Sequence, residues 1–189
     1  MFIKTYFHLL GLIAVLGVFS CKSQDTILKN SDELNKTFSM CPDDGKCSYN
    51  SFPNTAVKFH IDEFGMGYIE YLKKKSTLLK FEYQRDTLPN TADGHYIERV
   101  YIELPPAPKS FILKDNALQQ VNLLFERLCY CKGETGIYQI NTGTLSLTPL
   151  DDGRFHLKLH FKTSEVPQIL TEIDEIITLD QSNNAASDG

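Results

Sequence analysis

Apolar and polar side chains alternate with a period of two along much of this chain. The clearest stretch is 154–162, which reads RFHLKLHFK. An extended strand there would carry an apolar set of side chains on one face and a polar set on the other. The apolar set is Phe155, Leu157, Leu159 and Phe161, and the polar set is His156, Lys158 and His160. Such alternation is typical of an antiparallel sheet with one face in the core and the other in water.

Similar short stretches, rich in β-branched and aromatic residues, recur along the chain between turn-forming residues. We expect strands at 55–61, 68–72, 78–83, 95–104, 110–113, 137–140, 144–148 and 154–162. The lysine-rich segment 73–76 is expected to form a turn, and 132–136 a glycine-rich hairpin connection.

Two segments fit more than one structure. Residues 115–131 fit a helix, but they fit better a turn of helix at 116–120 followed by a strand over 121–131. Residues 171–179 fit a strand or a helix. In total, about nine short strands predict a mainly β fold, a single antiparallel β-sandwich or barrel-like domain with at most one or two short helices.

Composition agrees with one ordinary folded domain. The chain has 189 residues, of which 42% are hydrophobic and 23% charged. Its 24 acidic and 19 basic residues give a formal net charge of −5. Because nucleic-acid binders usually carry a basic excess, this balance argues against a nucleic-acid partner.

The N-terminus has the pattern of an export signal. Lys4 precedes an apolar run over residues 9–19, which is too short to cross a bilayer as a helix of about 20 apolar residues. The run ends in VFSC at 18–21, an aliphatic residue, a tolerant position, a small residue and then Cys21. This segment resembles the lipobox of bacterial lipoproteins, and the resemblance covers residues 1–21 alone.

The resemblance implies that the thiol of Cys21 receives a diacylglycerol and that its new amine is acylated, for example with palmitate. Several acyl chains together give stable anchoring, whereas a single chain binds membranes only marginally. Lys22 stands where an Asp favours the inner membrane in enterobacterial sorting, which implies anchoring to the outer membrane of the cell envelope. The expected parts are a cleaved lipoprotein signal peptide at 1–20, a lipidated flexible tether at 21–40, a β domain at 41–180 and a disordered tail at 181–189.

Four cysteines remain after the signal, namely Cys41, Cys47, Cys129 and Cys131. Export would place them in an oxidising compartment, where an even number of cysteines usually forms disulfides. Since one intervening residue strains a direct bond between Cys129 and Cys131, we expect each of them to pair with Cys41 or Cys47. A four-thiolate metal site is the sharper alternative, although these spacings are unusual for zinc, and the C-x-x-C of a thioredoxin-like site is absent.

The sequence contains no nucleophile elbow, zinc-protease motif, P-loop or dinucleotide-binding motif. His156 and His160 would lie about 13 Å apart on a strand, too far to bind one metal ion. We therefore predict no catalytic residue, cofactor or metal site. The predicted function is that of a membrane-anchored envelope lipoprotein with a non-catalytic binding or structural role. Its partners would be membrane lipid, through acylated Cys21, and an envelope protein or glycan. Two alternatives stay open, an envelope hydrolase or inhibitor with a site built from scattered loops, and a thiol metal-binding protein.

Overall fold

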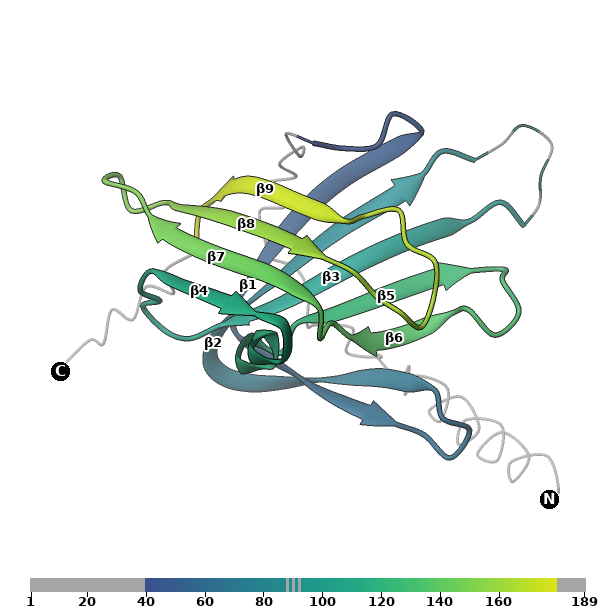
Figure 1. Ribbon diagram of the computed structural model, residues 1–189, viewed down its shortest axis with the longest axis horizontal. Helices are drawn as coiled ribbons and strands as arrows, with labels where there is room; N and C mark the ends of the chain where they lie inside the picture. Colours follow the sequence, from purple (N-terminus) through teal and green to yellow (C-terminus); the bar gives the residue numbers. More distant parts are fainter. Residues whose placement is uncertain (1–39, 88, 90, 92, 180–189) are drawn as a thin grey trace, which may run out of the picture. The chain divides into compact units, whose positions relative to one another are not determined.

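The computed structural model describes residues 40–87, 89, 91 and 93–179 (Figure 1). The predicted signal peptide, Cys21, most of the tether and the predicted tail at 181–189 lie outside the described residues. Within the described part of the chain, no helix is both long and apolar enough to cross a membrane.

Nine strands of the described residues form two antiparallel sheets, as the alternation predicted. The first, sheet A, has the order β1-β2-β3-β5-β6, and the second, sheet B, has the order β4-β7-β8-β9. Sheet A consists of β1 (Gly45–Ile61), β2 (Gly67–Arg85), β3 (Tyr96–Leu104), β5 (Leu124–Cys129) and β6 (Gly136–Gln139). Sheet B consists of β4 (Phe111–Lys114), β7 (Gly143–Pro149), β8 (Phe155–Phe161) and β9 (Glu172–Ile177).

The main core lies between the two sheets, so the fold is a β-sandwich (Figure 1). In β8, Leu157, Leu159 and Phe161 are buried in this core, while Lys158 and His160 on the alternate positions are exposed. Sheet A supplies Leu79, Phe81 and Tyr83 of β2 and Val100, Ile102 and Leu104 of β3 to the same core. The burial of alternate residues confirms the predicted faces of β8.

The predicted turn at 73–76 is wrong, because β2 runs through it without a break. Pro53 pairs with Thr77 and Thr55 pairs with Lys73, so that residue 54 of β1 lies opposite three residues of β2. This is a β-bulge, which bends a strand pair but does not end it. The lysines therefore mark a bend in one long hairpin, and turn chemistry was the wrong interpretation of them.

Beyond the bulge, the hairpin continues as a two-stranded arm, which comprises residues 55–73 and the turn at 62–66. The arm folds back over the outer face of sheet A, where Val57 packs with Tyr101, Leu124 and Ile137 in a second apolar cluster. Figure 1 shows the arm below β6, at the lower edge of the view. The second cluster explains why the polar face of sheet A also carries buried apolar side chains.

Each of the two ambiguous segments, 115–131 and 171–179, has a definite structure. Residues Asp115–Val121 form the 3₁₀ helix η1, which ends at Asn122 with φ of 44°, and β5 follows. The predicted strand over 121–131 is thus confirmed for its central part, and the segment at 171–179 contains β9. The connection at 132–136 joins the antiparallel strands β5 and β6, as expected.

Candidate functional site

The four cysteines form two local disulfides, and the predicted pairing between them is wrong. Cys41 bonds Cys47, with their Cα atoms 5.7 Å apart, and Cys129 bonds Cys131, with their Cα atoms 5.1 Å apart. The expectation of disulfides is confirmed, whereas the expectation that Cys129 and Cys131 reach back to the first pair is not.

Strand order explains why Cys47 and Cys129 do not pair. Cys47 lies on β1 and Cys129 on β5, with β2 and β3 between them in sheet A. Three strand spacings of roughly 4.8 Å place them about 14 Å apart. A disulfide needs Cα atoms within about 6.8 Å of each other. The sequence carries no signal for this separation, because it depends on which strands become neighbours.

The bond between Cys129 and Cys131 closes because the strand ends there. β5 stops at Cys129, and Tyr130 forms a bend. The resulting Cα separation of 5.1 Å falls inside the usual disulfide range of about 4.4–6.8 Å. The predicted strand over 121–131 would keep the chain extended through Cys131, whereas the observed bend at Tyr130 brings the two cysteines within disulfide range.

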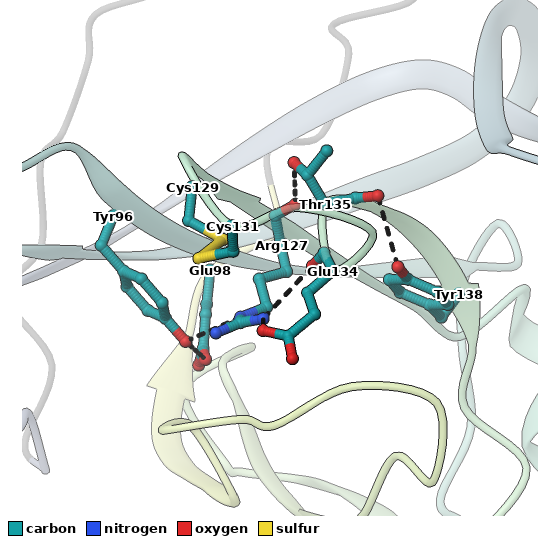
Figure 2. Close-up of a disulfide and its surroundings, with 8 residues drawn as sticks. All are labelled: Tyr96, Glu98, Arg127, Cys129, Cys131, Glu134, Thr135 and Tyr138. Carbon is teal, nitrogen blue, oxygen red and sulfur yellow. Dashed lines mark hydrogen bonds and ion pairs between the residues drawn. A yellow bond between two sulfur atoms is a disulfide. The ribbon is translucent and has the colours of Figure 1, made fainter. Parts of the chain in front are cut away.

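A cluster of polar side chains lies beside this disulfide, inside the end of the sandwich (Figure 2). Tyr96 donates its hydroxyl hydrogen to Oε1 of Glu98 at 2.5 Å, and Nε of Arg127 donates to the Tyr96 oxygen at 3.1 Å. Nη1 of Arg127 donates to Oε2 of Glu134 at 2.6 Å. The tyrosine hydroxyl thus links the buried carboxylate to the guanidinium.

Glu98 is the most buried charged residue of this cluster, with 0% of its surface exposed. Its carboxylate accepts the backbone N–H groups of Ile169 and Leu170, both at 2.7 Å. These two residues belong to the segment between β8 and β9, so the carboxylate of a sheet A residue holds a loop of sheet B. The sequence signal was present, since Glu98 alternates with Tyr96 and Val100 on the apolar face of a strand.

Burial and hydrogen bonding set the protonation states in this cluster. Burial raises the pKa of Tyr96, and the hydrogen bond to Glu98 raises it further. Burial acts to lower the pKa of Arg127, but its bonds to Glu134 and Tyr96 outweigh burial and raise that pKa. The cluster therefore keeps a neutral tyrosine and a cationic guanidinium at neutral pH, next to the disulfide.

A second network lies on the outer face of sheet A. Arg99 stands opposite Glu82 on one neighbouring strand and opposite Glu126 on the other. Its Nε donates to Glu82 at 2.6 Å and its Nη1 to Glu126 at 3.1 Å, while Tyr101 donates to the same Glu126 oxygen at 2.6 Å. Burial raises the pKa of Tyr101, and the charge of Glu126 adds to that effect. The network joins three strands across the face that the arm covers in part.

The histidines are placed apart from both networks. Nε2 of His156 and Oδ1 of Asp174 lie 2.5 Å apart on the outer face of sheet B, and Lys158 reaches the other oxygen of Asp174 at 2.9 Å. His60 lies 3.2 Å from Glu70 on the arm. His160 is exposed on the same strand as His156. In the part of the chain that the structure describes, no three His, Cys, Asp or Glu side chains are grouped to hold a metal ion.

The tip of the arm presents apolar side chains to solvent, which the sequence reasoning did not anticipate. Phe64 is 81% exposed, and Ile61 and Met66 on either side of it are 65% and 39% exposed. The turn is well ordered, because Oδ1 of Asp62 accepts the backbone N–H groups of Phe64 at 2.9 Å and of Met66 at 2.8 Å. The signal in the sequence was Asp62 with Phe64 and Gly65 shortly after it, between two strands.

Comparisons of the chain with protein-family models, with curated proteins and with solved structures give no match.

Proposed function

We propose that this protein is a lipid-anchored protein of the bacterial cell envelope, whose β domain has a non-catalytic binding role. The observation that carries the proposal is the sequence VFSC at 18–21 at the end of a short apolar run. Cleavage before Cys21 and acylation of that residue would attach the domain to the membrane, and Lys22 favours the outer membrane. The paired cysteines support an exported, oxidising location.

The arrangement of the charged side chains supports a binding role over a catalytic one. The carboxylate of Glu98 is occupied by two backbone N–H groups, and Arg99 is held between two carboxylates. These groups stabilise the sandwich and its outer face. A thiol metal site would require the four cysteines at 41–131 to be reduced, since they form disulfides in this structure.

We assign the binding surface to the arm tip, and its partner to an envelope protein. Phe64, Ile61 and Met66 form an exposed apolar tip on an ordered turn. Aromatic residues and methionine are enriched at the centres of protein interfaces, and a preorganised turn loses little freedom on binding. A glycan partner would instead call for polar side chains around an aromatic platform.

The anchoring part is tested by labelling cells with a palmitate analogue. We expect the wild-type chain and Lys22→Asp to be labelled, and Cys21→Ala to be unlabelled and to accumulate as an unprocessed precursor. Fractionation of the two labelled proteins then tests the membrane assignment, with the wild type in the outer membrane. Persistent labelling of Cys21→Ala would contradict acylation at this residue.

The binding part is tested with a photo-crosslinking amino acid placed at position 64 or at position 112 in intact cells. Ile112 on β4 is the matched control, because it is 68% exposed and lies on sheet B. Of these two positions, we expect only position 64 to give a discrete crosslinked protein. With the crosslinking amino acid at position 66 instead, we expect less of that crosslinked protein from the Phe64→Ser variant than from the chain with Phe64. Equal crosslinking from positions 64 and 112, or crosslinking to glycan at 64, would contradict the assignment.

A further inference from the structure

The two disulfides of this protein differ in how much chain they enclose. Cys41–Cys47 has a sequence separation of 6, and Cys129–Cys131 has a separation of 2. In the chain-entropy account, a disulfide stabilises a fold by restricting the unfolded chain, and this effect grows with the length of the enclosed loop. Reduction of the Cys129–Cys131 bond should therefore lower the free energy of unfolding less than reduction of the Cys41–Cys47 bond.

The two disulfides also differ in accessibility. In the first pair, Cys47 is buried among core residues and Cys41 is half-buried, whereas in the second pair both Cys129 and Cys131 are half-buried. Tyr130, between them, is 78% exposed. Exchange requires an incoming thiolate to reach a sulfur atom of the disulfide, so access favours the pair at the strand end.

The backbone around Cys131 is held by hydrogen bonds that do not involve sulfur. The N–H of Glu134 donates to the carbonyl oxygen of Cys131 at 3.1 Å. The Thr135 hydroxyl donates to the carbonyl oxygen of Arg127 at 2.9 Å (Figure 2). We therefore expect the connection between β5 and β6 to keep its conformation when the disulfide is reduced.

A guanidinium that is paired with a carboxylate lies beside the disulfide, since Nη1 of Arg127 donates to Oε2 of Glu134 at 2.6 Å. Arg127 and Cys129 are two residues apart on β5, so their side chains lie on the same face of the strand. Figure 2 shows the guanidinium of Arg127 and the disulfide on the same side of the ribbon. A neighbouring cation stabilises a cysteine thiolate relative to the thiol, and a stable thiolate is the better leaving group.

We propose that the Cys129–Cys131 disulfide is redox-active and accepts two electrons from a dithiol of a partner protein. A substrate thiolate attacks Sγ of Cys131, the bond between Cys129 and Cys131 breaks, and Cys129 leaves as a thiolate beside Arg127. The second substrate thiolate attacks the substrate sulfur of this mixed disulfide and releases Cys131 as a thiolate. The products are a substrate disulfide and a reduced Cys129–Cys131 pair. This activity goes beyond the proposed binding role and does not depend on acylation of Cys21.

Redox titration of the purified full chain tests the proposal. The chain is equilibrated in buffers of reduced and oxidised glutathione, free thiols are alkylated, and peptides containing each cysteine are quantified by mass. We expect Cys129–Cys131 to become reduced at a ratio of reduced to oxidised glutathione at least about tenfold lower than Cys41–Cys47 requires. The tyrosine circular dichroism should keep its folded signature while only that pair is reduced. Reduction of both pairs together, or unfolding on reduction of Cys129–Cys131, would overturn the proposal.

Electron transfer itself is tested with a reduced synthetic peptide that contains two cysteines, the probe for a protein dithiol. We expect the wild type to oxidise one peptide per chain, Cys129→Ser with Cys131→Ser to oxidise none, and Cys41→Ser with Cys47→Ser to keep the wild-type rate. If the last variant fails to fold, the wild-type reaction is stopped early by alkylation. Thiols should then appear at Cys129 and Cys131, and their appearance first at Cys41 and Cys47 would overturn the proposal.

Discussion

The carboxylate of Glu98 accepts the backbone N–H of Leu170 at 2.7 Å, across 72 residues of sequence. Glu98 lies in β3 of sheet A, and Leu170 lies just before β9 of sheet B. This bond and its neighbour at Ile169 connect the two layers through a charged group that is fully buried. A buried carboxylate is tolerated here because backbone donors replace its water shell.

We expect Glu98→Ala to lower the free energy of unfolding by about 3 kcal/mol, because it leaves the buried N–H of Leu170 and the half-buried N–H of Ile169 without an acceptor. Glu98→Gln retains one acceptor oxygen and should cost less. Urea unfolding followed by tyrosine fluorescence measures both changes. Glu172→Ala on the exposed face of β9 is the control, with an expected change within about 0.5 kcal/mol. An equal effect of the two alanine substitutions would show that the bonds of Glu98 do not stabilise the sandwich.

The contact of the arm with β6 is tested at Gly67. A Cβ atom at this position would lie 2.0 Å from the carbonyl oxygen of Ile137 and 2.7 Å from the ring of Phe59. Gly67→Ala should therefore lift the arm from sheet A, cost about 1–3 kcal/mol, and speed amide hydrogen exchange in residues 55–73. Gly65→Asn is the control, since position 65 has open space and a φ of 81° that Asn tolerates. Unchanged exchange in Gly67→Ala would mean that the arm does not rest on β6.

Tryptic peptides distinguish the two local disulfides from the crosswise pairing. Without reduction, cleavage after Lys46 should leave Cys41 and Cys47 on two peptides joined by a disulfide. Cys129 and Cys131 should both remain on the peptide 128–132, about 2 Da lighter than its reduced form because two hydrogens are lost. A peptide that joins 128–132 to either segment of the first pair would contradict the structure.

Glu103 links stability to pH. It accepts bonds from Lys74 at 2.7 Å and from Asn122 at 2.8 Å. Burial acts to raise its pKa, but these two bonds outweigh burial and hold the pKa below the ordinary value of 4.5. The folded chain therefore binds this proton less tightly than the unfolded chain, and stability from Glu103 is present above pH 4.5 and is lost as pH falls.

The matching variant is Glu103→Gln, which we expect to be less stable than the wild type at pH 7. The difference between their free energies of unfolding should shrink as pH falls below 4.5, where the wild-type carboxylate takes up its proton. Urea unfolding at a series of pH values measures that difference. A difference that stays constant down to pH 3 would show that the carboxylate charge is not the source of the stability.

Most strands could be predicted from the sequence because their signal is local. In β8, alternation alone placed Leu157 and Leu159 in the core, and the structure confirms both positions. The lysines at 73–75 misled the prediction for a physical reason. Polar residues are common in turns, and they are also common at a β-bulge, where extra residues of one strand face solvent. Only the pairing with the partner strand shows whether such a segment is a turn or a bulge.

The sequence by itself determined the β class, the buried face of most strands and the positions of most connections, because period-two alternation and turn-forming residues act within a few residues of each other. Tertiary structure decided which residues meet across the sheets. It separates Cys47 from Cys129 by two intervening strands, brings Leu170 to the carboxylate of Glu98, and folds the arm onto β6. These relationships depend on strand order and on a bend at one bulge, which are set by the packing of the whole core and leave no local pattern in the chain.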